Sequence, residues 1–206
     1  MSARFITLEG IEGVGKTTQA SVVADELRAL GHDVLLTREP GGSALGERVR
    51  AVLLDKTLPA MAPMTELLLV FAARAEHLDK VIRPALAAGR WVICDRFTDA
   101  TYAYQGGGRG LPLNAIEQLE ALVQAGLQPD LTLLFDAPVA IALSRARARG
   151  EGDRFEAERV EFFARIRDTY LARAGAAPLR VRILDASPDV DSVSAQLRRL
   201  LREICA

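Results

Sequence analysis

Cysteine and net charge are both scarce in this chain of 206 residues. The two cysteines, Cys94 and Cys205, have the spacing of neither a metal site nor a redox motif, so a reduced compartment is the expected setting. Cys94 lies inside an apolar run, and we interpret it as a small core residue and not as a nucleophile. The formal net charge of -1 gives no electrostatic reason to expect nucleic acid as a partner.

Long hydrophobic runs are missing as well. No run approaches the roughly 18 apolar residues of a membrane-spanning helix, and the N-terminus lacks the basic, apolar and small-residue segments of a signal peptide. These features predict a cytoplasmic protein that does not contact a membrane. The length fits a single domain, residues 1–206, and a chain of this size buries roughly 70% of its unfolded surface without needing disulfides or a structural metal.

Half of the residues are hydrophobic, in short runs that alternate with stretches of helical period. The runs predicted as strands are Arg4–Glu9, Asp33–Thr37, Trp91–Asp95, Leu131–Asp136 and Arg180–Asp185. The stretches predicted as helices are Thr17–Leu30, Leu45–Leu54, Thr65–Ala88, Leu113–Ala125, Val139–Arg149, Ala157–Ala174 and Val190–Ile204. The most loop-like interior segments are Arg38–Ser43, Gln105–Gly110 and Gly150–Asp153. This alternation predicts an α/β fold with helices on both faces of a parallel sheet.

A glycine-rich loop follows the first predicted strand and opens the first predicted helix. Residues 10–17, GIEGVGKT, match the phosphate-loop pattern G-x-x-x-x-G-K-[ST] in the context that the pattern requires. Glycines let consecutive N–H groups turn toward one anion, and the helix N-terminus adds positive potential. Lys16 is predicted to contact the β- and γ-phosphates and Thr17 to ligate Mg²⁺. The residues predicted to bind ATP here are Gly10, Ile11, Glu12, Gly13, Val14, Gly15, Lys16, Thr17 and Thr18.

Acidic residues close three of the predicted strands, at Glu9, Asp95 and Asp136. Ligands of a parallel sheet bind beyond the carboxyl ends of its strands, so these carboxylates are expected at the ligand edge. Asp95 is predicted to hold Mg²⁺ through water, and the adjacent Arg96 to contact a phosphate oxygen. The alternative is that Asp95 and Arg96 form a surface ion pair.

Five stretches together resemble the bacterial thymidylate kinases, P-loop enzymes that phosphorylate dTMP to dTDP. They follow one another along almost the whole chain: Glu9–Thr18, Thr37–Gly42 (TREPGG), Phe71–Arg74, Asp95–Gly110 (DR and YQGGGRG) and Arg145–Glu156. TREPGG and YQGGGRG are specific to the family, whereas the phosphate loop is not. The resemblance implies a P-loop NTPase fold with a five-stranded sheet of order 2-3-1-4-5, a homodimer, and ATP with Mg²⁺ and dTMP as ligands.

The resemblance also implies residues for the acceptor. Glu12 is similar to the carboxylate that contacts the acceptor's 3′-hydroxyl. Arg50 and Arg96 are similar to the pair that clamps its phosphate, and Pro40 and Glu39 to residues of the thymine pocket. For Arg50 alone, a solvated helix position is the alternative.

Further residues resemble those at the base and sugar. Arg74 is similar to the residue that donates to the pyrimidine carbonyl. Thr101 and Gln105 lie four residues apart, on one face of a helix, and are expected at the opposite edge of the base. Tyr104 is similar to the ring under the deoxyribose, where a 2′-hydroxyl would clash.

One position departs from the family pattern. The stacking aromatic often lies four residues before the arginine, where this chain has Val70, while Phe71 lies three residues before Arg74. Spacings of three and four share a helix face, so Phe71 is predicted to stack on the base. The alternative is that Phe71 belongs to the core.

Arginines surround a glycine-containing segment, which we interpret as a mobile lid at about residues 146–156 that closes over ATP. Position 13 of the phosphate loop is glycine, and the chain is therefore similar to the class that takes its catalytic arginine from the lid. Arg154 is predicted to contact the transferring phosphoryl group, with support from Arg149. Asp153 and Glu156 are expected to organise the closed lid. A solvated basic face is the alternative.

The adenine end is expected near the last loop. Arg145 is predicted to pack against adenine, and the loop residues Ala186 and Pro188 to cradle it through their backbone.

The sequence thus predicts a nucleoside monophosphate kinase that converts ATP and dTMP to ADP and dTDP. The acceptor oxygen is already ionised, so catalysis rests on positioning and charge neutralisation. The residues predicted to be catalytic are Lys16, Asp95, Arg96, Arg149 and Arg154. Two alternatives remain, a P-loop kinase for another acceptor and an ATP-hydrolysing switch or assembly protein.

Overall fold

The computed structural model describes residues 4–148, 154–155 and 158–205. Within them, five parallel strands form one sheet in the order β2-β3-β1-β4-β5. The strands are β1 (Phe5–Glu9), β2 (Val34–Arg38), β3 (Trp91–Asp95), β4 (Leu131–Asp136) and β5 (Val181–Asp185). Both the strand positions and the strand order agree with the prediction, so the carboxyl ends of β1 and β3 lie side by side.

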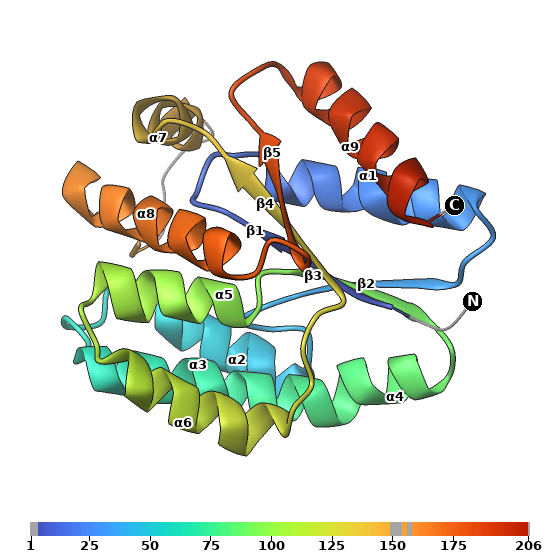
Figure 1. Ribbon diagram of the computed structural model, residues 1–206. Helices are drawn as coiled ribbons and strands as arrows, with labels where there is room; N and C mark the ends of the chain where they lie inside the picture. Colours follow the sequence, from blue (N-terminus) through green and yellow to red (C-terminus); the bar gives the residue numbers. More distant parts are fainter. Residues whose placement is uncertain (1–3, 149–153, 156–157, 206) are drawn as a thin grey trace.

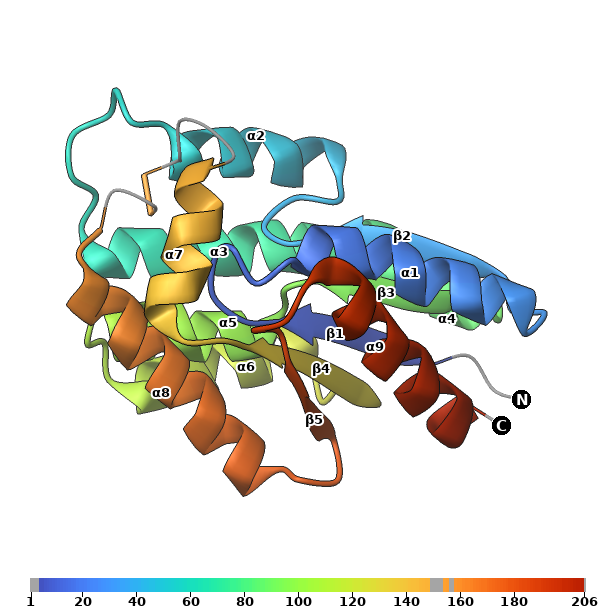
Figure 2. The same ribbon diagram turned by 90° about the horizontal axis from the view of Figure 1, so that it is seen from above.

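Helices cover both faces of the sheet (Figure 1). The helices α1 (Lys16–Ala29) and α9 (Val190–Cys205) lie together on one face, also in the turned view of Figure 2. The opposite face carries α3 (Pro63–His77), α4 (Arg83–Ala87) and α6 (Leu113–Gln124). The other α-helices of the described residues are α2 (Ala44–Leu54), α5 (Thr98–Thr101), α7 (Val139–Ala148) and α8 (Val160–Ala176). None of the helices in these described ranges has the length and apolarity to cross a membrane.

Alternation along the strands divides the apolar side chains between the two faces. On β1, Ile6 and Leu8 pack into the core that includes residues of α1 and α9. Phe5 points to the opposite face and packs beside Ile82 and Cys94. Cys94 is fully buried, and burial raises the pKa of its thiol, so the core assignment is confirmed.

The long helix predicted for Thr65–Ala88 is divided. Three segments form it, namely α3, the π-helix η1 (Leu78–Ile82) and α4. The helix starts at Pro63, where the missing N–H of proline costs nothing. Pro84 follows η1 and has no N–H to donate to the carbonyl four residues earlier, so the wider helical turn lies where regular hydrogen bonding would fail anyway.

The predicted loop Gln105–Gly110 is mostly helical, which corrects the sequence interpretation. A π-helix, η2 (Tyr102–Gly108), continues directly from α5. Its glycines permit close packing and do not break the helix. A Cβ on Gly107 would lie 2.0 Å from Thr169 Oγ1, and one on Gly108 would lie 2.6 Å from the Phe162 ring, both on α8. The glycine run thus brings α8 against the element that carries Tyr104 and Gln105.

Candidate active site

A cleft opens beyond the carboxyl ends of β1 and β3. Its volume is about 1040 Å³ when the solvent-filled space at its opening is included. The phosphate loop, the segment after β2, α3 and the α5–η2 helix all contribute to its wall. The predicted site residues that line it are Glu12, Gly13, Gly15, Lys16, Thr17, Glu39, Pro40, Arg50, Arg74, Asp95, Arg96, Thr101, Tyr104 and Gln105. The structure therefore brings together residues from stretches that are far apart in the sequence.

The phosphate loop has the backbone that its glycines predict. Gly10 and Gly13 have φ values of 136° and 81°, and Gly15, at 87°, is the N-cap of α1. A Cβ on Gly13 would lie 1.8 Å from the carbonyl oxygen of Ala142 on α7. Any side chain at position 13 would thus have to displace α7, and the loop cannot carry an arginine of its own there.

Lys16 begins α1 at the floor of the cleft. Its Nζ donates to the carbonyl oxygens of Gly10 at 2.9 Å and Ile11 at 2.7 Å. Burial, followed by the positive charge of Arg96, lowers the pKa of Lys16 to about 8. An incoming polyphosphate offers this ammonium group a stronger partner than two backbone carbonyls.

Thr17 and Asp95 meet next to Lys16. Thr17 Oγ1 donates to Asp95 Oδ2 at 3.1 Å, so the end of β3 faces the start of α1. A hydroxyl and a carboxylate at a phosphate site suit Mg²⁺, which prefers oxygen ligands and keeps several of its waters. These two residues fit the ion that the sequence predicted for them.

Arg96 is held in a strained position at the centre of the cleft. Its φ of 71° is rare for a residue with a side chain. Its Nη2 donates to Glu12 Oε1 and to Tyr104 Oη, each at 3.0 Å, and its Nη1 donates to the Gly10 carbonyl at 3.0 Å and to Tyr170 Oη at 3.2 Å. Arg96 pairs with Glu12, so the alternative of a surface ion pair with Asp95 is wrong.

Arg50 reaches the same cleft from α2. Its Nη1 donates to the carbonyl oxygen of Pro40 at 2.9 Å, which ties it to the segment after β2. Because Arg50 lines the cleft, it is not simply a solvated helix residue. Two guanidinium groups, those of Arg50 and Arg96, therefore face one cavity, and this arrangement suits a phosphorylated acceptor.

The far end of the cleft is built around Arg74. Its guanidinium donates through Nε to Glu39 Oε2 at 2.7 Å and through Nη2 to Thr101 Oγ1 at 3.0 Å. Nη1 of Arg74 is buried and has no hydrogen-bond partner among the described residues. Behind it, the buried His77 contacts Glu39 Oε1 through Nδ1 at 3.0 Å and Thr37 Oγ1 through Nε2 at 2.7 Å. Arg74 is thus fixed in place, with its buried Nη1 nitrogen left without a hydrogen-bond partner among the described residues.

The prediction for Phe71 is wrong. Phe71 is buried in a cluster with Leu67, Tyr102 and Ile116, and Val70 lines the cleft in its place. Its ring does lie under the Arg74 guanidinium, with the central carbon 4.9 Å from the ring centroid. Spacing alone could not separate the cleft-facing side of α3 from its core-facing side, because α6 and η2 decide which side is covered.

Only part of the predicted lid lies within the residues that the structure describes. Arg149, Asp153 and Glu156 lie outside the described residues. Among the described residues, Arg154 contacts α2 and α3 and not the phosphate loop: its Nε donates to the Leu53 carbonyl at 3.0 Å and its Nη2 to Glu66 Oε2 at 2.6 Å. The Arg154 guanidinium pairs with the buried carboxylate of Glu66 and does not remain in solvent. No sequence motif had pointed to Glu66.

Arg145 holds the last loop. Its guanidinium donates to the carbonyl oxygens of Ala186 and Ser187, both at 2.6 Å, and of Pro188 at 2.9 Å. The sequence placed Arg145 and this loop together correctly. The guanidinium is engaged by the loop backbone, so Arg145 supports the loop.

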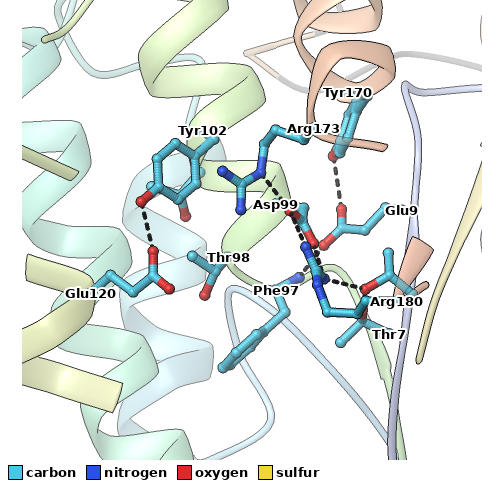
Figure 3. A network of polar contacts seen from close by, with 12 residues as sticks. Thr7, Glu9, Phe97, Thr98, Asp99, Tyr102, Glu120, Tyr170, Arg173 and Arg180 are labelled. Carbon is cyan, nitrogen blue, oxygen red and sulfur yellow. Dashed lines mark hydrogen bonds and ion pairs between the residues drawn. The ribbon is translucent and has the colours of Figure 1, made fainter. Parts of the chain in front are cut away.

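Sequence reasoning missed a buried polar cluster behind the cleft (Figure 3). Glu9 Oε1 accepts from the Phe97 N–H at 2.7 Å and Oε2 from Tyr170 Oη at 2.8 Å. Asp99, close by, pairs with Arg173 and with Arg180. Burial first, and the charge of Asp99 second, raise the pKa of Glu9 to about 8. The acid at the end of β1 was the only sign of this cluster in the sequence.

The fold and the cleft together define a P-loop kinase of nucleotides. A phosphate loop at the first strand, the oxygen pair of Thr17 and Asp95, two arginines and the polar residues around Arg74 line one cavity. The family model for thymidylate kinase matches residues 8–197, and the chain belongs to this family.

Relatives support the same assignment. The chain is 59% identical to the thymidylate kinase of Pseudomonas syringae pv. tomato over 204 residues, covering 99% of this chain and 97% of the relative. It is 56% identical to that of Alcanivorax borkumensis over 206 residues, covering 100% and 99%. The crystal structure of thymidylate kinase from Ehrlichia chaffeensis superimposes with a TM-score of 0.80 at 34% identity, covering 98% of this chain and all of that one. The family and the enzyme class predicted from the sequence are thereby confirmed.

Proposed function

We propose that this chain transfers the γ-phosphoryl group of ATP to dTMP, giving dTDP and ADP, as a step toward dTTP. The observation that carries the proposal is the buried Arg74 at the far end of the cleft, with one donor, Nη1, left unpaired. A buried unpaired donor is costly unless a ligand acceptor completes it. The 4-carbonyl of thymine is such an acceptor, and the 4-amino group of cytosine is not.

On the ATP side, the loop N–H groups and Lys16 would hold the β- and γ-phosphates. Thr17 and Asp95 would hold Mg²⁺, which neutralises charge on the phosphates. The two-arginine site of Arg50 and Arg96 would hold the acceptor phosphate in line with the γ-phosphoryl group. The attacking oxygen is already ionised, so no base is needed and these contacts lower the barrier by positioning and charge neutralisation.

On the acceptor side, Glu12 and Tyr104 lie at the sugar. Tyr104 Oη donates to Glu12 Oε2 at 2.6 Å, so the two side chains form one wall where the 3′-hydroxyl and the 2′ position would lie. Thr101 and Gln105 come from the same continuous α5–η2 helix as Tyr104 and line the cleft, where they would face the base.

The transferring phosphoryl group still needs a positive partner from the lid. Arg149 and Arg154 would contact the transferring phosphoryl group. The Ala186–Pro188 loop and Arg145 would bind adenine. Arg154 would have to exchange Glu66 for phosphate oxygens when both substrates are bound.

A cytoplasmic location and a homodimer also stay predictions. Sedimentation of the purified protein measures whether it is a dimer. Leu68 and Met64 on α3 support a homodimer because they are half-exposed apolar side chains.

Four monophosphates test the proposed acceptor. We expect kcat/KM to be highest for dTMP, roughly 10–200-fold lower for dUMP, which lacks only a methyl group, and lower by about 10⁴ for dCMP. The ribonucleotide form of dTMP should also be disfavoured because of Tyr104. Arg74→Ala should damage the use of dTMP and shrink its advantage over dCMP, because a repulsive donor is gone.

The assay follows ADP and the phosphorylated product together. Equal use of dCMP and dTMP by the wild type would refute the thymidylate assignment and leave a P-loop kinase for another acceptor. Free phosphate formed in place of dTDP would instead favour an ATP-hydrolysing switch.

A further inference from the structure

Glu66 on α3 is a fully buried carboxylate that contacts the base end of the cleft only through another residue. Its Oε1 accepts from Gln105 Nε2 at 2.9 Å and from Arg109 Nε at 3.3 Å. Its Oε2 accepts from Arg154 Nη2 at 2.6 Å. Glu66 does not line the cleft, whereas Gln105 does.

This contact fixes the direction of the Gln105 amide. An amide has a donor end and an acceptor end of nearly the same shape, so its orientation is set by its partners. A carboxylate paired with two guanidinium groups offers only acceptors, and it therefore takes the NH₂ end of Gln105. Oε1, the acceptor end, makes no hydrogen bond within the part of the chain that the structure describes, and it remains for a ligand in the cleft.

We propose that Glu66 is a specificity-determining residue that acts through Gln105. By holding the NH₂ group, it makes position 105 present an acceptor to the cleft while Arg74 presents a donor. The inference rests on the proposed function, because it assumes that the base binds between these two side chains. The ligand that matches this pair is a pyrimidine with an N–H at position 3 and a carbonyl at position 4.

Cytosine has the reverse pattern, an unprotonated N3 and a 4-amino group. Against the fixed pair, both of its groups would face like partners, donor to donor and acceptor to acceptor. If the Gln105 amide could turn over, the mismatch at N3 would disappear and only the mismatch with Arg74 would remain. Glu66 thus closes the route by which the pocket could adapt to cytosine.

Glu66→Gln removes the constraint, since a neutral amide at position 66 can also donate to Gln105. The substrates are dTMP and 5-methyl-dCMP, which carry the same methyl group and differ only at positions 3 and 4. We expect the ratio of their kcat/KM values to fall by about 10-fold or more. In a Gln105→Ala background, Glu66→Gln should leave the ratio unchanged, since there is no amide left to orient.

Arg109→Lys is the matched control. It disturbs the same cluster but keeps the Glu66 carboxylate, so it should not change the ratio even if it lowers both rates. A merely structural role of Glu66 would lower both rates together. An unchanged ratio in a folded Glu66→Gln variant, or an equal fall in the Gln105→Ala background, overturns the proposal. Equal use of both nucleotides by the wild type would instead refute the proposed function.

A measurement on the wild-type protein settles the matter if Glu66→Gln does not fold. The Gln105 side-chain NH₂ protons are identified in the NMR spectrum by their loss in Gln105→Ala. They should keep their shifts and slow exchange when dTMP binds, because they stay on Glu66. A change of these shifts together with fast exchange when dTMP binds would show that the amide has left Glu66, and it would overturn the proposal.

Discussion

Lys16 shows how far burial alone changes the chemistry of one residue in the cleft. Its ammonium group is desolvated and lies near the Arg96 charge, and these two effects lower its pKa to about 8. At pH 8 to 9, a large share of the free enzyme therefore has a neutral Lys16. Bound triphosphate adds negative charge beside it and restores the proton.

We predict that ATP binding takes up about half a proton per site at pH 8 and close to one at pH 9, because the pKa of Lys16 in the free protein is about 8. Calorimetry in two buffers of different ionisation enthalpy measures this number. The uptake should vanish below about pH 6.5, where Lys16 is already charged. In Lys16→Ala it should be absent at every pH, and kcat should fall by at least about 10-fold. Equal uptake by wild type and Lys16→Ala would assign the proton to another group.

Arg154 has two possible partners, and its substitution separates them. If it moves from Glu66 to the transferring phosphoryl group, Arg154→Ala lowers kcat by about 10²–10⁴ and hardly changes the KM for dTMP. If it only pairs with Glu66, the variant loses stability and keeps its turnover. Steady-state kinetics and thermal unfolding on one preparation distinguish these results. An unchanged kcat would move the catalytic role to Arg149.

At the scale of elements, the junction of η2 with α8 positions the acceptor side of the cleft. Gly107 and Gly108 let α8 approach the backbone of the helix that carries Tyr104 and Gln105, while Gly106 faces Leu113 and Ile116 on α6. In addition, Arg165 on α8 donates to the carbonyl oxygen of Gly108 at 2.9 Å. Helix packing, and not a phosphate-binding turn, therefore explains glycines 106–108, whereas Gly110 has a positive φ of 74° that favours glycine.

Gly107→Ala tests this explanation. Its new Cβ would meet Thr169 Oγ1 and the Arg165 carbonyl, so we expect a loss of roughly 1–3 kcal/mol in the free energy of unfolding. The KM for dTMP should rise as η2 is displaced. Gly175→Ala is the matched control, because a Cβ there meets nothing within 4 Å, and it should leave stability the same or improved. Chemical denaturation of both variants measures the difference, and equal stabilities would contradict the packing argument.

For the molecule as a whole, the buried acid Glu9 contributes to the pH dependence of stability. Its pKa is raised from an ordinary 4.5 to about 8 by burial and by Asp99. At a pH between these two pKa values, Glu9 keeps its proton in the folded chain and has released it in the unfolded chain. The contribution of Glu9 to stability is thus complete below about pH 4.5, and it is lost as pH rises through about 8.

Glu9→Gln removes this dependence. The variant should gain stability relative to the wild type as pH rises from 5 to 8, with a slope of at most about 1.4 kcal/mol per pH unit. Unfolding at several pH values measures the difference between the two proteins, in which other titrating groups largely cancel. The exposed Glu117→Gln should show no such trend. A constant difference for Glu9→Gln would mean that Glu9 is ionised in the folded protein throughout.

Local sequence determined those parts of this protein whose chemistry is carried by contiguous residues. The phosphate loop with Lys16 and Thr17 was predictable because glycine torsions and a helix N-terminus act over eight neighbouring positions. The strands were predictable because side chains buried on both faces leave continuous apolar runs. The TREPGG and YQGGGRG stretches pointed to the family, and hence to Arg74 and Arg96, through resemblance.

Only the tertiary structure decided which side of each helix faces the cleft. Phe71 and Val70 are adjacent on α3, and packing against η2 and α6 buries the first and leaves the second at the cavity. Glu66 and His77 belong to no motif, and the roles of Glu66, His77 and Glu9 arise from partners 38 to 161 positions away in the chain. The physical reason is that burial and hydrogen bonding depend on what the fold brings close, whereas helical period and glycine torsion depend only on near neighbours in the chain.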